Sequence, residues 1–361
     1  FRRVPPGFQA PLRAQCNRQH SSCSHLLPVD LGDLQLHGLA HHASHIAALG
    51  LVLLIKGGDW FVDGATGIAE RFHVPEIIIG ATVVSIGTTL PEVMVSSTSA
   101  LTGHGEIAYG NAIGSIICNT ALIAALTVAV RPGPVDTKSL KPPVIFFFTS
   151  AAIFCLNAYI SGYFSRVLGV VMLAIFALYL FVTVRQGFRN PAGQQDEDAD
   201  HAEDLSMGKA ALLLVVGAAL IAVGANLLVN NGTLIAQAMG VPESVIALTF
   251  VALGTSLPEL VTAITSLVKG HGALSLGNII GANIFNLVLV CGVSMALAPF
   301  RIPQSSTIAG MNASLVLDIP LMLFVMAFLC LPALARKKLS RFQGIVLLAV
   351  YAAFCAIQFS M

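Results

Sequence analysis

Charged residues are scarce in this chain of 361 residues: Lys, Arg, Asp and Glu together make up 10% of it, and the formal net charge is +1. A protein that binds nucleic acid presents a surplus of Lys and Arg to the phosphates, so this composition indicates no nucleic-acid partner. Aromatic residues are few, at 7%. The remainder is strongly apolar, with a mean hydropathy of +0.82, which is typical of a polytopic membrane protein with the lipid bilayer as its partner.

Two catalytic motifs are absent, the H-E-x-x-H zinc site and the G-x-S-x-G nucleophile elbow. We therefore expect no enzyme and no cofactor. Cysteines number only seven; five lie in apolar runs and are expected to be small buried residues, whereas Cys16 and Cys23 in the N-terminal tail could pair. The chain begins with Phe1 rather than Met, as expected of a fragment, a processed chain or a mis-assigned start.

What the sequence does contain is an internal repeat at an offset of 167 positions. Residues 46–132 align without a gap on residues 213–299, and 32 of the 87 positions are identical. A match of this length indicates a duplicated unit. Apolar segments of membrane-spanning length are predicted at about 43–70, 76–101, 106–130, 143–160 and 164–185, and again at about 209–237, 243–268, 272–297, 312–334 and 341–360.

Each half therefore has five spans, and five is an odd number. The second unit must enter the membrane in the opposite sense to the first, so the predicted fold is all-α, with ten transmembrane helices in two inverted five-helix repeats. The predicted domains are a disordered tail (1–42), a first repeat (43–185), an acidic cytoplasmic linker (186–207) and a second repeat (208–361).

Lys and Arg residues gather in alternate connections. The connections after spans 1, 3, 5, 7 and 9 carry Arg71, Arg131, Lys138, Lys141, Arg185, Arg189, Lys209, Lys269, Arg336, Lys337, Lys338 and Arg341. The opposite connections carry only Arg166 and Arg301. Cytoplasmic loops are the ones rich in Lys and Arg, so we expect a multi-pass protein of the plasma membrane (the inner membrane of a bacterium) with both termini outside the cytoplasm.

One short motif occurs in both repeats. Residues 86–92 read I-G-T-T-L-P-E, and residues 253–259 read L-G-T-S-L-P-E. Both copies place a glutamate, Glu92 or Glu259, within a predicted span, where a charge costs roughly 2.5 kcal/mol or more unless it is paired or hydrated. Two carboxylates at equivalent positions of inverted repeats predict one shared site between the halves.

The proline before each glutamate should interrupt its helix. Pro91 cannot donate a backbone hydrogen bond to Gly87, so helices 2 and 7 are predicted to be broken at membrane depth. Freed carbonyls, the hydroxyls of Thr88 and Thr89 and the carboxylate then converge, and Thr255 and Ser256 do the same around Glu259. Oxygen ligands of this kind suit Na⁺ and Ca²⁺ rather than soft metals.

A polar stripe on the third and eighth spans supplies a second wall. Asn111, Ser115 and Asn119 recur every four residues on one helix face, as do Asn278, Ala282 and Asn286 in the copy. Such a stripe can also be a set of hydrogen bonds that merely holds helices together. Two carboxylates, two amides, hydroxyls and carbonyls together can supply the 6–8 oxygens that Ca²⁺ takes.

The first span also carries charges. Lys56 and Asp59 are three residues apart and can neutralise each other on one helix face. Asp59 and Asp63 become Asn226 and Asn230 in the copy. We expect a structural or interfacial role for the two aspartates rather than direct ion binding.

The paired motifs G-T-[ST]-x-P-E and G-N-x-[IV]-G-[SA] resemble those of the calcium/cation antiporter superfamily, and most closely the compact prokaryotic sodium/calcium exchangers. The resemblance covers residues 43–360 and implies alternating access by sliding of the first and sixth helices. It also implies ion contacts from Glu92, Thr88, Thr89, Ser115, Asn119, Glu259, Thr255, Ser256 and Asn286, and from the carbonyls of Ser85 and Ala252. Many exchangers carry an aspartate in place of Asn286 and a serine in place of Ala282.

Three functions remain open on the sequence. A secondary antiporter exchanging Ca²⁺ for Na⁺ at one midplane site is favoured, because two carboxylates balance one Ca²⁺ or two Na⁺. A proton-coupled calcium exchanger would use the same glutamates as H⁺ carriers. A passive cation channel is less favoured, because a closed site with paired carboxylates suits a carrier. We expect a monomer or a weak oligomer.

Overall fold

The structure is a computed structural model, and it describes residues 31–189, 206–238, 252–304 and 307–360. In these residues nine helical stretches are long and apolar enough to cross a membrane. They are α1 (Leu31–Phe72), α2–η1–α3 (Glu76–Leu101), α4–η2–α5 (Gly105–Val130), α6 (Thr137–Ile160), α7 (Arg166–Arg189), α8 (Met207–Ala238), α12–η4–α13 (Gly272–Leu297), η5–α14 (Ser314–Arg336) and α15 (Arg341–Ser360).

The predicted seventh span, 243–268, is described only in part. Its described portion consists of α10 (Ala252–Thr255) and the short apolar helix α11 (Leu257–Val268), while residues 239–251 lie outside the described residues. The predicted bounds of the other spans agree with the structure to within a turn or two at most ends. The exception is the predicted tail: α1 begins at Leu31, so residues 31–42 are helical, and no proline follows Pro28 to interrupt the helix before the first span begins.

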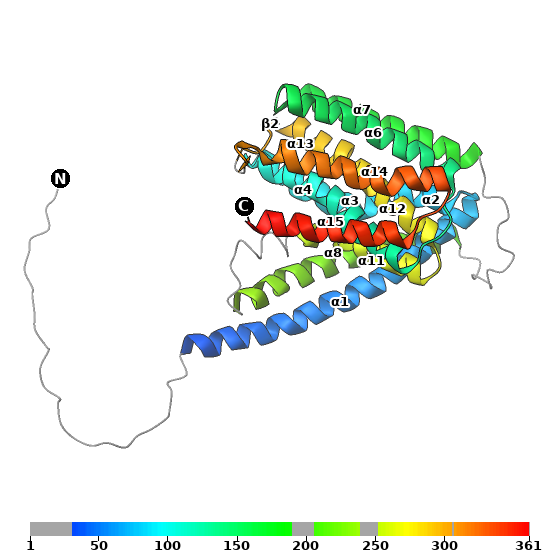
Figure 1. The fold of residues 1–361 in the computed structure, drawn as a ribbon. Coiled ribbons are helices and arrows are strands. Elements are labelled where there is room, and N and C mark those ends of the chain that lie inside the picture. Colours follow the sequence, from blue (N-terminus) through cyan, green and yellow to red (C-terminus); the bar gives the residue numbers. More distant parts are fainter. Residues whose placement is uncertain (1–30, 190–205, 239–251, 305–306, 361) are drawn as a thin grey trace, which may run out of the picture.

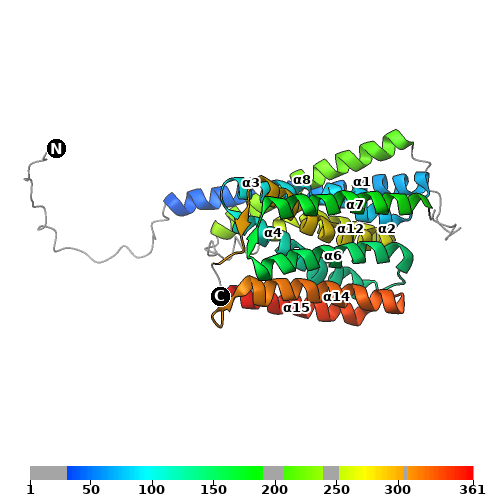
Figure 2. The same cartoon turned by 90° about the horizontal axis from the view of Figure 1, so that it is seen from above.

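Helices α1 and α8 lie side by side along one face of a bundle formed by the other helices (Figures 1 and 2). Glycines make this contact very close. A Cβ atom on Gly57 would lie 2.9 Å from the backbone nitrogen of Ile221, and one on Gly224 would lie 2.7 Å from the carbonyl oxygen of Gly50. Small residues at such positions let two transmembrane backbones approach. We refer to this contact as the glycine seam.

The two proline-containing spans differ from each other. In the second repeat the helix is broken at Ser256, and α11 restarts with Pro258 in its first turn, as predicted. In the first repeat α3 (Ser85–Leu101) runs through Pro91, so the break predicted there is wrong. The irregularity lies upstream, in the π-helical segment η1 (Gly80–Val84), where the hydroxyl of Ser85 donates to the carbonyl of Gly80 at 2.7 Å.

Two spans are more buried than the other candidate spans. One consists of α4 (Gly105–Cys118), η2 and α5 (Ala125–Val130), and the other of α12 (Gly272–Phe285), η4 and α13 (Cys291–Leu297). The two repeats are also joined at their ends. Strand β1 (Tyr163–Phe164) pairs antiparallel with β2 (Phe300–Arg301), and Pro134 forms a bridge with Lys338. A hairpin of β3 (Thr307–Ile308) and β4 (Met311–Asn312) precedes η5 (Ser314–Asp318) and α14 (Ile319–Arg336).

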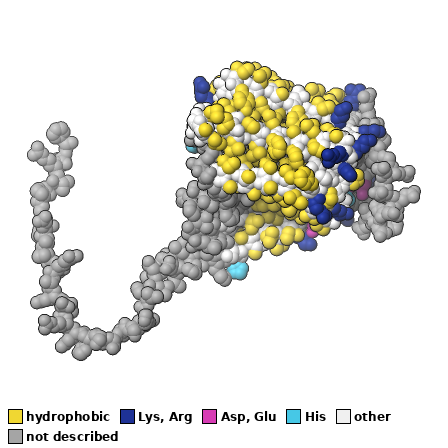
Figure 3. All heavy atoms as spheres, in the orientation of Figure 1, with side chains coloured by type: hydrophobic (Ala, Val, Ile, Leu, Met, Phe, Trp, Pro, Cys, Tyr) yellow, Lys and Arg dark blue, Asp and Glu magenta, His cyan; other side chains and the backbone are white. Residues whose placement is uncertain are grey.

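Lys and Arg side chains gather at one end of the helix bundle, and a broad hydrophobic surface runs between the ends (Figure 3). Val167, Val268 and Ile160 are among the exposed hydrophobic residues, each more than 70% exposed. A belt of this kind, with cations at one rim, is what a bilayer-spanning protein presents to lipid. We refer to the rim with many Lys and Arg side chains as the basic end.

Candidate ion-binding site

Glu92 and Glu259 lie completely buried in the interior, on α3 and α11. Both oxygens of Glu92 and one oxygen of Glu259 have no hydrogen-bond partner among the described residues. The two carboxylates are close enough to interact electrostatically. Buried polar atoms are normally satisfied, so these unpartnered carboxylate oxygens make Glu92 and Glu259 candidate cation ligands.

Asn119 and Asn286 also lie fully buried, and all four of their side-chain amide atoms lack a partner among the described residues. Each asparagine opens a π-helical segment, η2 (Asn119–Ala124) or η4 (Asn286–Val290). Segments of this type are frequent at functional sites, because the widened turn changes where side chains point and leaves backbone carbonyls free for other partners. The equivalent placement in both repeats makes the two asparagines a symmetric pair.

Hydroxyl groups of the first repeat contact the stripe of the second. Ser85, the first residue of α3, donates to the carbonyl of Asn278 at 2.9 Å, and Thr88 donates to the side-chain oxygen of Asn278 at 3.2 Å. All three residues are buried. Thr89, also buried, donates to a carboxylate oxygen of Glu259 at 3.4 Å, so the G-T-T-L-P-E motif reaches the glutamate of the opposite repeat.

The reciprocal contacts run from the second repeat to the first. Thr255 donates to the side-chain oxygen of Asn111 at 3.1 Å, and the hydroxyls of Ser256 and Ser115 are 3.5 Å apart. Asn111 in turn donates to the carbonyl of Glu92 at 3.4 Å. Ala252 of α10 is the equivalent of Ser85 of α3 at the offset of 167 residues, so the two predicted carbonyl ligands occupy matching positions of the two repeats.

Glycines on α12 permit the closeness of these walls. Gly277 packs directly against the backbone of Ile77, and Gly281 against Ala81 and the hydroxyl of Ser85. A Cβ atom at either position would overlap the neighbouring helix, so the G-x-x-x-G spacing brings α12 against the second span as a backbone-to-backbone contact. This approach is what places Asn278 within reach of Ser85.

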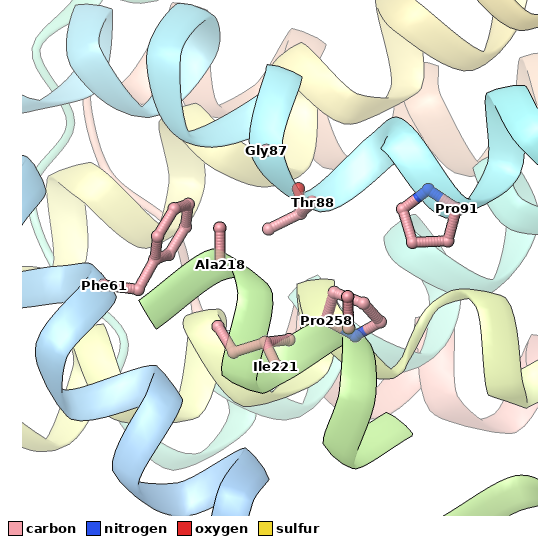
Figure 4. A pocket seen from close by; sticks show the side chains of 8 residues that line it. Phe61, Gly87, Thr88, Pro91, Ala218, Ile221 and Pro258 are labelled. Carbon is pink, nitrogen blue, oxygen red and sulfur yellow. The ribbon is translucent and has the colours of Figure 1, made fainter. Parts of the chain in front are cut away.

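A small pocket lies beside the site, between the site helices and the α1–α8 pair (Figure 4). Phe61 of α1 faces it from one side, and Ala218 and Ile221 of α8 line another. Thr88 and Pro258 line the wall that belongs to the site helices. Any movement of α1 and α8 along the bundle therefore changes what covers the hydroxyl of Thr88.

Two residues of this network, Asn111 and Asn278, were noticed in the sequence only as members of the polar stripe, and their role of joining the repeats was missed. Their exact equivalence in the repeat alignment was the signal that could have revealed it. The polar stripe is thus partly a set of interhelical hydrogen bonds, while Asn119 and Asn286 remain unpartnered among the described residues. Within these residues no cluster of three or more His, Cys, Asp or Glu side chains occurs, so the donors that converge are mainly hydroxyls and amides.

Comparison with known proteins identifies the family of the chain. A family model described as sodium/calcium exchanger protein matches residues 42–185 and 209–360. An uncharacterized membrane protein of Methanocaldococcus jannaschii is 35% identical over 303 residues, which are 84% of this chain and 93% of that protein. The chain belongs to the sodium/calcium exchanger family. The family's match in two segments, one in each half, follows the same division as the internal repeat.

Two further members of the sodium/calcium exchanger family are similar over nearly their full length. The sodium/calcium exchanger MaX1 of Methanosarcina acetivorans is 30% identical over 349 residues, which are 87% of this chain and 97% of MaX1. A solved structure of the sodium-calcium exchanger NCX_Mj matches with a TM-score of 0.72 and 33% identity, covering 88% of this chain and 99% of NCX_Mj. The chain is therefore a multi-pass membrane protein with the fold of a solved exchanger.

Proposed function

We propose that this protein exchanges Ca²⁺ for Na⁺ across a membrane by alternating access, with one ion site between its two repeats. The observation that carries the proposal is the set of unpartnered oxygens on the fully buried side chains of Glu92, Glu259, Asn119 and Asn286, at equivalent positions of the two repeats. Two carboxylates balance the charge of one Ca²⁺ or two Na⁺, and amide and hydroxyl oxygens complete the coordination that hard cations require.

The proposed ion ligands are the symmetric groups of the two repeats. Carboxylates and amides come from the four residues just named, hydroxyls come from Thr88, Thr89, Ser115, Thr255 and Ser256, and backbone carbonyls come from Ser85 and Ala252. Because oxygen ligands bind both Ca²⁺ and Na⁺, the two ions would compete for this site. A site that both ions share, and that crosses the membrane only when filled, gives antiport rather than passive flow.

The α1–α8 pair is the proposed moving part. The glycine seam joins the two helices backbone to backbone, and the pair packs on the site helices across the small pocket of Figure 4. Sliding of the pair would expose the site to one side of the membrane and then to the other. The joined ends of the repeats, at β1–β2 and at the Pro134–Lys338 bridge, support a rigid block against which the pair moves.

The proposed location is the plasma membrane, the inner membrane in a bacterium, with the basic end in the cytoplasm and both chain termini outside. An Escherichia coli relative, inner membrane protein YrbG, is 34% identical over 293 residues. The clustering of Lys and Arg at one end supports the orientation. We propose a monomer or weak oligomer, because the described helices bury the site residues within one chain. Labelling of a cysteine placed at the C-terminus in intact cells tests the orientation.

The decisive experiment uses the purified protein in liposomes that contain a calcium-sensitive dye. An inward Ca²⁺ flux that starts when an outward Na⁺ gradient is imposed supports the proposal. Flux driven by a pH gradient alone, with no response to Na⁺, would contradict sodium coupling and favour proton-coupled calcium exchange. Ca²⁺ entry that continues at the same rate without any counter-ion would indicate a channel.

A further inference from the structure

One cation ties α1 to the rest of the protein at the basic end. Lys269 lies in the turn after α11, and its ammonium nitrogen is 2.7 Å from a carboxylate oxygen of Asp63 and 3.7 Å from one of Asp59. It also donates to the backbone carbonyl of Asp59 at 3.1 Å. Both aspartates belong to α1. Asp59 therefore pairs with Lys269, 210 residues away, and not with Lys56 of its own helix.

Helix α1 packs against α11 between the site and the basic end. Helix α11 runs from Glu259 towards Lys269, and α1 covers it in between. A Cβ atom on Gly58 of α1 would lie 2.7 Å from a side-chain carbon of Val261 and 2.8 Å from the hydroxyl of Thr265. Any side chain at position 58 would overlap Val261 and Thr265, so the close packing of α1 on α11 requires glycine there. The lysine ion pair lies just beyond this contact and holds it in place.

The equivalent positions at the opposite end have different chemistry. The offset of 167 residues places Thr102 where Lys269 stands, and it places Asn226 and Asn230 where Asp59 and Asp63 stand. Thr102 donates to the carbonyl of Thr98 in its own helix, and Asn230 donates to Asn226 within α8. Among the described residues, the side-chain hydrogen bonds of Thr102 and Asn230 thus stay local, and the part of α8 from Asn226 to Ala238 carries no charged residue that could join α8 to the turn.

Among the described residues, the opposite end also lacks the close cover. Met94 is the equivalent of Val261. Met94 is 66% exposed, whereas Val261 is partly buried and packs against α1. Thr98, the equivalent of Thr265, is exposed as well. The repeats are thus in unequal positions: α1 packs on α11 at the basic end, and α8 does not pack in the same way on α3 at the other.

From these contacts we infer that Lys269 is a positioning residue for ion exchange. Its pairing with Asp59 and Asp63 holds the α1–α8 pair in the state closed at the basic end, and the uncharged residues at the opposite end offer nothing equal to the other state. The inference rests on the proposed function and adds to it a built-in preference for one side. Sliding of the pair breaks two ionic contacts at one end, and the described equivalents of these residues at the other end carry no charge with which to form new ones.

A preference of this kind changes the apparent affinity on the two sides in opposite directions. Ions bind from the open side to the populated state, whereas ions from the closed side must wait for a minor state, and their apparent affinity falls by the fraction of that state. Removal of the ion pair should therefore strengthen Ca²⁺ binding at the cytoplasmic face and weaken it at the external face. A simple loss of stability would lower transport from both faces alike.

The test uses Lys269→Thr, which gives the basic end the residue found at the opposite end. Sodium-dependent ⁴⁵Ca²⁺ uptake is measured in right-side-out and in inverted membrane vesicles. We expect the ratio of the cytoplasmic to the external half-saturating Ca²⁺ concentration to fall three- to tenfold. Lys141→Thr, a removal of another lysine at the basic end, is the matched control and should leave the ratio unchanged.

A second measurement reads the conformation without transport. Met94→Cys is introduced and labelled from outside with a membrane-impermeant maleimide, with the unchanged chain as the blank. We expect the labelling rate to fall about threefold when Lys269→Thr is added, because α8 then covers Met94 more of the time. Lys269→Arg should restore both the ratio and the labelling rate, since an arginine can hold the same two carboxylates.

The outcomes separate the two proposals. An unchanged ratio together with unchanged labelling in Lys269→Thr would overturn the inference, and so would an equal loss of uptake from both faces that Lys269→Arg does not correct. Absence of sodium-dependent Ca²⁺ uptake by the unaltered protein would overturn the proposed function instead. The labelling measurement would still decide in that case whether Lys269 positions α1.

Discussion

The two repeats carry nearly the same site motif and yet fold it differently. Around Glu259 the helix is broken at Ser256, whereas around Glu92 it continues through Pro91 and is widened upstream at η1. The ends differ too, with charged contacts at Lys269 and only amides and a hydroxyl at its counterpart. An inverted repeat that alternates between two states must place its halves in unequal positions at any one moment. The two repeats thus share their proposed ion ligands, and they differ in how closely α1 packs on α11 and α8 packs on α3.

The shared part gives the largest expected effect. Glu92→Gln and Glu259→Gln should each reduce sodium-driven Ca²⁺ uptake more than 100-fold, because each removes a carboxylate ligand, and the two losses should be alike despite the different helices. Uptake is measured in liposomes with the calcium-sensitive dye. Both variants should stay folded, since neutralising one glutamate relieves repulsion in the interior. Uptake at the unaltered rate in either variant would contradict the site.

The asparagines test whether the symmetry extends to the amides. Asn119→Ala and Asn286→Ala should each raise the half-saturating Ca²⁺ concentration about tenfold, because each removes one oxygen ligand without changing the charge. Asn283→Ala is the matched comparison. Its amide nitrogen donates to the hydroxyl of Thr120 at 2.8 Å, so this change breaks an interhelical hydrogen bond and should lower thermal stability more than Ca²⁺ affinity. Equal affinity effects in all three would remove the special role of the symmetric pair.

The glycine seam tests whether α1 and α8 act as one body. Gly57→Val and Gly224→Val should each destabilise the helix pair by roughly 2 kcal/mol, because the added side chain overlaps the backbone of the partner helix. Thermal unfolding in detergent measures the loss. Gly133→Ala, where a Cβ atom would meet no other heavy atom within 4 Å, is the control. If Gly57→Val unfolds at the same temperature as Gly133→Ala, the glycine seam does not hold the two helices together.

The smallest effect concerns a second ion pair at the basic end. The Nδ1 atom of His271 is 2.7 Å from a carboxylate oxygen of Glu76, and this hydrogen bond raises the pKa of His271 above its usual 6.5 against the opposing effect of burial. A raised pKa means that the pair stabilises the fold fully below pH 6.5 and that this contribution is lost as the pH rises through the folded value.

Accordingly, His271→Gln should lower thermal stability at pH 6 by about 0.5 kcal/mol, the usual size for a partly exposed pair, and should have less effect at pH 9. Differential scanning fluorimetry at the two pH values measures the difference. His104→Gln, the equivalent change in the first repeat, sharpens the comparison between the two ends. A loss for His271→Gln that is the same at both pH values would show that the imidazole acts by packing and not by its charge.

Much of the architecture could be predicted from the sequence, because hydrophobic length and the repeat register depend on local residues. The span that ends at Leu101 and the one that begins at Gly272 were predicted to within a residue. The π-helical turns at Asn119 and Asn286 could not be predicted, because packing between spans far apart in sequence produces them. Helical continuation through Pro91 was missed for the same reason: the widened turn at η1 precedes the proline and depends on Ser85 and its neighbours on α12.

The ion-pair partner of Asp59 shows the same limit on a smaller scale. Lys56 is the partner that spacing along one helix suggests, and Lys269 is the partner that α1 meets once it lies against α11. The equivalence of residues 102 and 269 was visible in the repeat alignment, but its meaning was not, because a Thr-to-Lys change acquires significance only when the helix opposite is known. The motif residues Glu92 and Glu259, in contrast, could be picked out without any tertiary information.

The glycine seam also bears on leakage. Because the backbones of α1 and α8 are in contact, the two helices must move together. A displacement that opens the site at one end of the bundle therefore closes it at the other end. A pathway open at both faces at once would require α1 and α8 to part, and their contact leaves no side chains that could stretch to bridge a gap. Protection of the ion gradients would then lie in a mechanical linkage as much as in the affinity of the site.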